Sequence, residues 1–280
     1  MNQTTISEPV QIQGVGLHTG VEVKLRLRPA PENTGYIFVR TDLDNFEIPA
    51  SVEYVSHCSY ATTLMRRGVV LSTCEHVLSA LRGSNIDNCF IELDSIELPI
   101  LDGSSENWVE LLAEAGVKEL DSPRRWFEVL KRVDFDEDGR RMSIEPSEHF
   151  EIDCVIDFPH PLVKRQSFRF VMHNGSYSKQ IASARTFGFT HEIEMLRKAN
   201  LALGGSLYNA IVLTPDGMLN EEPLRYDDEF VRHKILDIIG DIALIGLPLR
   251  AKITAERSGH AIHAAMMSKL LKTEGAWQIS

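Results

Sequence analysis

The stretch Arg232–Asp241 contains the residues whose types and spacing best suit metal chemistry. His233, Asp237 and Asp241 recur every four residues inside an apolar run over 230–247, so in a helix they would share one face. A histidine and a carboxylate at positions i and i+4 can bind one divalent cation between them. The spacing therefore predicts part of a metal site on this helix.

A further candidate ligand lies far away in the sequence, in Ser72-Thr73-Cys74-Glu75-His76. Two histidines and one carboxylate, with a fourth position left to water or substrate, are typical of a catalytic zinc site. His76, His233 and Asp237 would form such a set. Taken separately, Glu75-His76 is more simply a polar helix start, and His233 with Asp237 an ion pair or a core histidine. The sequence contains no HExxH motif, so the common zinc-protease pattern is absent.

The composition excludes several classes of protein. A net charge of −11 argues against a general nucleic-acid-binding or anionic-membrane surface, and 43% hydrophobic residues are enough for buried cores. The four cysteines form no CxxC pair and suggest no disulfide framework. We see no signal peptide and no apolar run of about eighteen residues. We therefore expect a cytoplasmic protein with no nucleic-acid partner and no stable membrane insertion.

The elements expected in the first half of the chain are short strands followed by helices. Strands are predicted at Val21–Arg28, Val69–Leu71 and Cys89–Leu93. One helix is expected to follow an N-cap at Ser72 or Thr73, and another to run over Glu106–Ala115 and end at Gly116. The segment Asp121–Arg125 is expected to be a linker.

The second half repeats this order. Strands are predicted at Trp126–Val133, Arg141–Ile144, Glu151–Phe158 and Ser167–Val171. Helices are predicted at Ile193–Ala199, Tyr226–Leu247 and Gly259–Leu271. Strands first and helices later in each half indicate two similar α+β layers, which would fit a duplication, although no residue-level repeat is visible.

Several other motifs have simple structural interpretations when each is taken alone. The run Gly14–Gly20 is not a dinucleotide-binding loop, because its third glycine comes one residue late and a strand follows it, so a turn is expected. Cys74 is interpreted as a packing residue and not as a nucleophile. His260, in Ser258-Gly259-His260, is expected near a helix N-terminus. Ser183–Phe189 is an aromatic loop with a central hydroxyl, and Leu203–Ser206 allows close backbone approach.

Taken together and in this order, these segments resemble the UDP-3-O-acyl-N-acetylglucosamine deacetylase family, zinc enzymes of lipid A biosynthesis. The resemblance covers nearly the whole chain. Its motifs are Gly14–Gly20, Glu75-His76, Ile86-Asp87-Asn88, Leu101-Asp102-Gly103-Ser104, Ser183–Phe189, Gly204-Gly205-Ser206-Leu207, His233–Asp237 and Ser258-Gly259-His260-Ala261.

The resemblance implies zinc ligands at His76, His233 and Asp237, the same three residues that the spacing suggests. Zinc is then the expected cofactor, with ferrous iron as the alternative. The implied reaction is hydrolysis of the acetamide of UDP-3-O-acyl-N-acetylglucosamine, which releases acetate and UDP-3-O-acyl-glucosamine. The protein is expected to act as a monomer.

The resemblance also implies roles around the metal. It places the general base at Glu75 and a second acid/base group at His260, which would protonate the departing amine. Asp241 would be the carboxylate that orients and charges that histidine. Thr186 matches a threonine that supports the oxyanion, and Lys234 a lysine beside the metal.

The implied fold is an α+β sandwich of two similar domains, 1–121 and 126–280. Each would be a small, mainly antiparallel sheet with two helices, and the helical layers would pack together between the sheets. Each domain would also carry an insert. The first is expected near 41–66, and the second, near 190–220, should form the hydrophobic passage for the acyl chain.

Substrate contacts are implied at seven positions: Leu17, Phe158, Phe187, Ile193, Gly205, Ser206 and Val212. Phe158 resembles a uracil-contacting position, and the passage is expected near Ile193 and Val212. Lys234 and Arg185 are expected to neutralise the diphosphate.

Three residues depart from the family pattern. Cys74 stands where a small aliphatic residue is usual, Tyr208 where Asp is common, and His263 where Asn is common. Two other classes of function remain open. A zinc amidase for another N-acyl sugar would keep the metal centre, whereas a catalytically silent binding protein would lose Glu75 or His260. The family's fusion with an acyl dehydratase needs a much longer chain.

Overall fold

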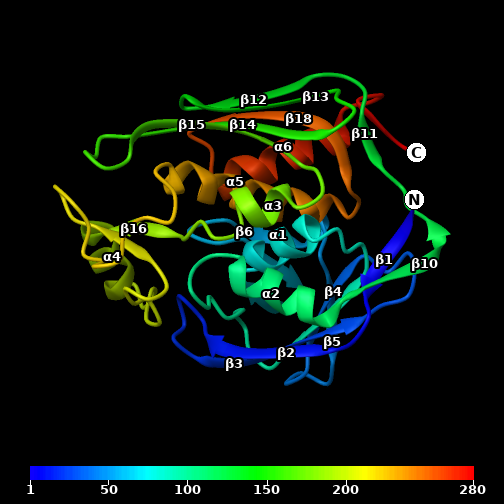
Figure 1. The fold of residues 1–280 in the computed structure, drawn as a ribbon, viewed down its shortest axis with the longest axis horizontal. Helices are drawn as coiled ribbons and strands as arrows, with labels where there is room; N and C mark the ends of the chain where they lie inside the picture. The colour runs from blue at the N-terminus through cyan, green and yellow to red at the C-terminus, as the bar shows by residue number, and fades with distance from the viewer.

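The computed structural model describes residues 1–280, and its main elements form four layers (Figure 1). A sheet lies at the top of the view, two helical layers follow beneath it, and a second sheet closes the bottom. The predicted α+β sandwich, with helices packed together between two sheets, is confirmed. None of the helices combines the length and the apolar character needed to cross a bilayer.

The sheet at the bottom of Figure 1 belongs to the first half of the chain. Its strands, in spatial order, are β2 (Val10–Val15), β3 (Glu22–Pro29), β9 (Cys89–Leu93), β4 (Tyr36–Arg40) and β5 (Phe46–Pro49). Only the β4–β9 pair is parallel. Val23, Leu25 and Leu27 alternate with exposed residues along β3, so one face of the sheet is buried. The helices α1 (Glu75–Gly83) and α2 (Glu106–Ala115) belong to the layer beside this sheet.

The sheet at the top belongs to the second half. Its path runs through β12 (Val133–Glu137), β13 (Arg140–Glu145), β18 (Leu249–Glu256), β11 (Phe127–Val129) and β19 (Trp277–Ile279). The hairpin of β14 (Phe150–Phe158) and β15 (Lys164–Val171) joins the sheet where β14 pairs with β18. Beneath it lie α5 (Glu229–Ile242) and α6 (His260–Lys272).

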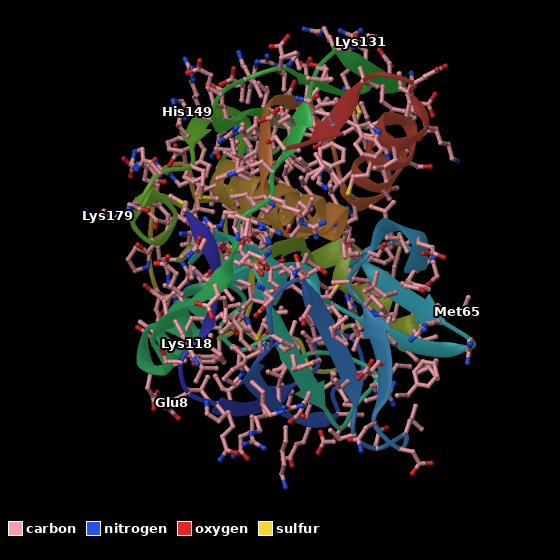
Figure 2. The ribbon with its side chains drawn as sticks, turned by 90° about the vertical axis from the view of Figure 1, so that its right-hand side faces the viewer. Glu8, Met65, Lys118, Lys131, His149 and Lys179 are labelled. Atoms are coloured by element: carbon pink, nitrogen blue, oxygen red, sulfur yellow. The ribbon has the colours of Figure 1, made fainter.

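Smaller elements surround these layers. They are β1 (Asn2–Ile6) paired with β10 (Val117–Pro123); η1 (Val52–Tyr54); the sheet of β6 (Val55–His57), β7 (Thr63–Arg66) and β8 (Val69–Ser72); α3 (Ser176–Gln180); β16 (Phe187–Phe189) paired with β17 (Ile211–Leu213); α4 (Thr190–Lys198); and η2 (Ala243–Ile245). Met65, on β7, lies at the edge of the molecule in Figure 2. The boundaries of the two domains and of their inserts stay predictions.

The two inner helical layers meet where α1 crosses α5, and this contact is unusually close. A Cβ atom added to Gly240 would lie 2.0 Å from the carbonyl oxygen of Glu75, so only glycine permits the crossing. Residues on all sides of α5 are buried, as expected for a helix at the centre of a sandwich. Glu75 and His76 on α1 are thereby brought against the histidine and aspartate of α5.

Several predicted boundaries are wrong, among them the starts of β15 at Lys164 and of α4 at Thr190, and four of the errors have an identifiable cause. The first helix begins at Glu75 after Cys74, because Thr73 has φ of 59° and its hydroxyl donates to Glu97 instead of capping the helix. The predicted strand 126–133 is two strands, β11 and β12, since the N–H groups of Leu130 and Lys131 donate to Ala276 outside any ladder.

The other two boundary errors concern the linker and the longest helix. The expected linker 121–125 continues β10 to Pro123, and Arg124 then pairs with Asp87 at 2.7 Å. The helix expected over 226–247 is shorter, because the chain tightens into η2 and leaves the helical conformation at Gly246, where φ is 89°.

The most consequential omission from the sequence interpretation is β18, the central strand of the second sheet. Leu249, Ala251, Ile253 and Ala255 are buried and alternate with partly or fully exposed residues. This period-two pattern was visible in the sequence. The strand pairs with β11, β13 and β14, and it leads directly into α6.

Candidate metal centre

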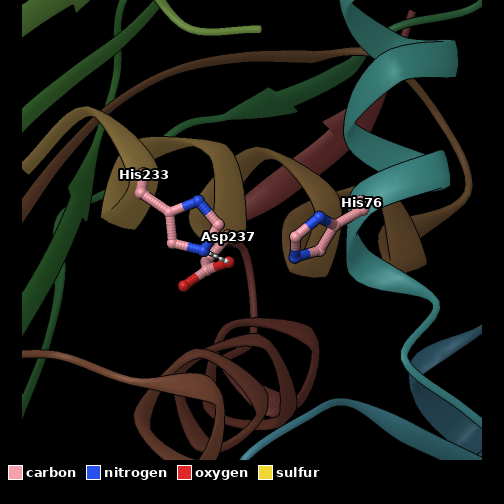
Figure 3. A group of neighbouring side chains, drawn as sticks. All are labelled: His76, His233 and Asp237. Carbon is pink, nitrogen blue, oxygen red and sulfur yellow. Dashed lines mark ion pairs between the residues drawn. The ribbon is translucent and has the colours of Figure 1, made fainter. Parts of the chain in front are cut away.

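Three side chains converge between α1 and α5. His76 is the second residue of α1, and His233 and Asp237 lie one turn apart on α5 (Figure 3). One nitrogen from each ring and one carboxylate oxygen all lie within 4.8 Å of one another. All three residues are buried, and Asp237 Oδ1 is 3.4 Å from His233 Nε2. The structure thus brings together the three residues that the sequence predicts as metal ligands.

Both imidazoles are held by backbone carbonyls on the side away from Asp237. The Nδ1–H of His233 donates to Ala184 O at 2.9 Å, and that of His76 donates to Ser104 O at 3.4 Å. Each bond fixes the tautomer and leaves Nε2 with a free lone pair, which is the usual arrangement behind a metal-binding histidine. Two loops that were identified only as motifs, 101–104 and 183–189, therefore orient the two rings.

These loops are fixed against each other and against the 190–220 segment. The N–H of Thr186 donates to Gly103 O at 2.8 Å, and that of Ser105 donates to Ala182 O at 2.8 Å. Gly103 has φ of 82°, and a Cβ atom there would lie 2.1 Å from Asn209 O. The conformation and the close contact both require glycine.

The protonation states of the three residues suit a divalent cation. Burial lowers the pKa of His76 and lowers that of His233 to about 3, so both rings are neutral. Burial opposes ionisation of Asp237, but the charged Lys234 and His260 outweigh it and hold the pKa of this carboxyl well below its usual range. Two neutral imidazoles and one carboxylate are donors that fit zinc and related transition metals.

Lys234 donates from Nζ to Asp237 Oδ2 at 2.8 Å and lies over the ring of Phe187. Burial alone would lower the pKa of Lys234, but Asp237 raises it, so the ammonium stays charged. The lysine thus occupies one oxygen of Asp237 and leaves Oδ1 directed toward His233.

Glu75 precedes His76 and is 3% exposed. Its Oε2 accepts from the Thr62 N–H at 3.1 Å, and its Oε1 lies 3.9 Å from His260 Nε2. Burial raises the pKa of Glu75 to about 7; His260 opposes this shift, whereas Asp241 and Asp237 add to it. A buried carboxyl with a raised pKa is suited to accept and release a proton.

A second cluster lies around Asp241, one turn beyond Asp237. His260 and His263 each donate from Nδ1 to Asp241 Oδ2 at 2.7 Å, and the Thr62 hydroxyl donates to Oδ1 at 2.6 Å. Burial would raise the pKa of Asp241, but His260 and His263 lower it to about 2. Burial disfavours the charged form of His260, yet Asp241 and then Glu75 raise its pKa to about 10.

A cavity of about 450 Å³ opens beside the α4 segment. Leu17 and His18 from the turn after β2 line it, together with a wall from 186–219. Six of the seven residues expected to contact substrate line this cavity: Leu17, Phe187, Ile193, Gly205, Ser206 and Val212. Thr186 lines it as well. Most of the lining side chains from 186–219 are apolar, as an acyl chain would require.

The seventh residue, Phe158, lies outside the cavity lining. Its ring packs 5.8 Å from Phe187 and 5.7 Å from Phe189, measured between centroids. It therefore backs the cavity wall through Phe187, and its contact with uracil stays a prediction.

The expectation for Arg185 is wrong. Arg185 is buried and donates to Glu229 from Nε at 2.9 Å and from Nη2 at 3.2 Å, so its charge is already neutralised inside the protein. Glu229 also accepts from the Arg185 N–H, which holds the start of α5 against the loop that carries Ala184. This arginine supports the metal site and is unavailable to a diphosphate.

Sequence reasoning missed two residues of the Asp241 cluster. Thr62 lies on a loop 179 positions from Asp241 and carries no sequence signal for its role. His263 did have one, because it follows His260 by three residues and so shares its helical face.

The predicted turn at Gly14–Gly20 is organised by another buried group, Glu97, which accepts from the N–H groups of His18 and Thr19.

Comparison with known proteins extends these findings. The profile of the UDP-3-O-acyl N-acetylglycosamine deacetylase family matches residues 3–272. The chain is 46% identical to the UDP-3-O-acyl-N-acetylglucosamine deacetylase of Solibacter usitatus, over 99% of this chain and 94% of that protein. Its identity is 45% with the enzymes of the same name from Myxococcus xanthus and Coxiella burnetii, where the match covers 99% and 100% of this chain and 89% and 93% of those proteins.

Proposed function

The chain belongs to the UDP-3-O-acyl N-acetylglycosamine deacetylase family, and on that premise we propose that His76, His233 and Asp237 hold the metal of its active site. The enzyme hydrolyses the acetamide of UDP-3-O-acyl-N-acetylglucosamine to UDP-3-O-acyl-glucosamine and acetate in lipid A biosynthesis. We propose Zn²⁺ as the native metal because the donors are two imidazoles and one carboxylate; Fe²⁺ is the alternative. That the enzyme lies in the cytoplasm and acts as a monomer stays a prediction.

One observation carries the assignment of the site. Two neutral imidazole nitrogens and an ionised carboxylate converge within 4.8 Å, and two ionisable groups, Glu75 and His260, lie beside them. Metal-assisted hydrolysis of an amide needs this combination of a cation site, a base and an acid.

The chain's own residues supply the proton transfers. A divalent cation, when bound, would polarise the acetamide carbonyl and make water easier to deprotonate. Glu75 takes the proton from the attacking water, since it is next to His76. The Thr186 hydroxyl donates a hydrogen bond to the carbonyl oxygen as negative charge develops there. His260, held protonated by Asp241, donates its proton to the amine nitrogen as the C–N bond breaks, because an amide anion is too poor a leaving group.

The cavity beside α4 is the proposed acyl passage. Val212 is 8% exposed and lines it, so Val212→Phe should shorten the space available to the chain. We expect kcat/KM to fall selectively for long-chain substrates, at about 0.8 kcal/mol for each methylene contact that is lost. The measurement compares long- and short-chain substrates. Val117→Phe, on exposed β10, is the matched control. An equal loss for both chain lengths would assign Val212 to general packing.

A change at Asp241 should move the pH profile. In Asp241→Asn the carboxylate that raises the pKa of His260 is lost, so this pKa falls. Because His260 must be protonated to act, activity is lost as pH rises through its pKa, and the alkaline limb of kcat/KM should move to lower pH. Metal content should stay normal. If the limb stays in place in Asp241→Asn but disappears in His260→Ala, another group sets the charge of His260.

The overall proposal is tested by mass spectrometry of acetate release from UDP-3-O-acyl-N-acetylglucosamine with two acyl lengths. Release from both, at different rates, is the expected result. Activity confined to another N-acyl sugar would instead favour a different zinc amidase with the same centre.

A further inference from the structure

We propose that His263 is a positioning residue for deacetylation, which holds Asp241 in the place from which its carboxylate orients His260. This inference rests on the proposed function, because it gives His263 a part in the same reaction. His263 stands where asparagine is common in the family, and none of the catalytic roles described above uses it.

The geometry joins the two histidines through one oxygen atom. His263 follows His260 by three residues on α6, and both Nδ1–H groups donate to Asp241 Oδ2 at 2.7 Å. The ring planes are 80° apart and the centroids are separated by 6.0 Å, so the rings approach the oxygen from different directions. His263 is 1% exposed, whereas the side chain of His260 is 11% exposed and next to Glu75. Only His260 is therefore placed to meet substrate.

The far side of His263 is also fixed. Its Nε2 lies 3.0 Å from the Ser258 hydroxyl, and in the neutral ring it accepts from this hydroxyl because Nδ1 carries the proton that Asp241 accepts. Ser258 lies in the turn between β18 and α6. The ring is thus held by hydrogen bonds at both nitrogens. It connects the turn that contains Ser258 with the carboxylate of Asp241.

Asp241 needs this anchor because a competing arrangement lies close by. The Thr62 hydroxyl donates to Asp241 Oδ1, but Thr62 Oγ1 is also only 3.3 Å from His260 Nδ1. If the carboxylate turned, His260 could donate to the hydroxyl oxygen instead and lose its ionic partner. With Thr62 on Oδ1 and His263 on Oδ2, both oxygens are held and the carboxylate plane is fixed. A hydrogen bond to a charged group is strong enough to select one arrangement.

Two polar replacements separate this role from simple packing. The amide nitrogen of asparagine lies about where the histidine Nδ1 does, so His263→Asn should keep the bond to Asp241 and lose the contact with Ser258. The amide of glutamine reaches the position of Nε2, so His263→Gln should keep the Ser258 side and lose Asp241. Both variants remove the ring, and both leave a polar amide in its place.

The first measurement is steady-state kinetics of the metal-loaded enzyme. We expect His263→Asn to stay near the wild-type kcat. His263→Gln should lose kcat on the order of tenfold to a hundredfold, as found when a group behind a reacting residue is misplaced, with little change in KM. His149→Asn, the same substitution at an exposed surface site, should change nothing (Figure 2). Equal kcat values for the asparagine and glutamine variants would overturn the inference.

The second measurement does not depend on activity. In protein labelled with ¹⁵N-histidine, the two imidazole N–H protons bonded to Asp241 should appear as separate low-field NMR signals. Asp241→Asn should remove both. Each His263 variant should remove the signal of His263. The remaining signal, from His260, should keep its position in the asparagine variant and shift in the glutamine variant. An unshifted His260 signal in both variants would refute the positioning role. A wild-type protein that gives both signals but releases no acetate would refute the proposed function instead.

Discussion

A protein with alanine in place of His233 is expected to lose its metal and its deacetylase activity together. The substitution leaves His76 and Asp237 as the only candidate ligands, too few for a catalytic zinc site with three protein donors. The loss of activity should exceed the roughly 10–100-fold typical of residues that act behind a ligand. Metal content by inductively coupled plasma mass spectrometry and acetate release would be measured on the same preparation.

His149→Ala is the matched control, because it removes an exposed imidazole that is not part of the cluster. It should retain full metal content and activity. Circular dichroism of His233→Ala should match the wild type, which separates loss of metal from loss of fold. Stoichiometric metal in a folded His233→Ala protein would move His233 out of the ligand set.

Glu75→Ala should have the opposite signature, with normal metal content and a rate lower by roughly 10²–10⁴, the usual contribution of a positioned base. Glu75 is assigned to proton transfer and not to metal binding. Its carboxylate faces Thr62 and His260, while the three candidate ligands face one another. The measurements are metal content and kcat under saturating substrate.

Glu75→Gln keeps the size of the side chain and a carbonyl oxygen for the Thr62 N–H, so it controls for packing and for an unsatisfied buried donor. We expect it to be nearly as inactive as Glu75→Ala. A metal-free Glu75→Ala protein would show that Glu75 is itself a ligand. Near-normal activity in Glu75→Gln would show that the base lies elsewhere.

Local patterns predicted those parts of the molecule that depend on neighbouring residues. The bounds of α2 and β9 were predicted as the structure has them, because each has a clear periodicity and α2 also ends at a glycine. The four-residue spacing of His233 and Asp237 placed them on one face of α5, where they lie.

Contacts between distant segments had no such pattern. Nothing local connects Thr62 with Asp241, or the carbonyl of Ala184 with the ring of His233, since these pairs are 179 and 49 residues apart. The central position of β18 is decided by three partner strands. Arg185 was assigned to a diphosphate because sequence does not show that Glu229 already pairs with it.

The close approach at Gly240 has a consequence for how substrate enters and leaves. Enzymes built from two halves often open and close around their substrate by a hinge motion between the halves. Here the proposed base and one candidate ligand lie on α1, and the other two candidate ligands lie on α5. The two helices touch at a point with no room for a methyl group. An opening between the two halves would separate the candidate metal ligands on every turnover. We therefore expect α1 and α5 to stay in contact throughout the catalytic cycle, and the substrate's acyl chain to enter and leave at the periphery, through the cavity beside α4.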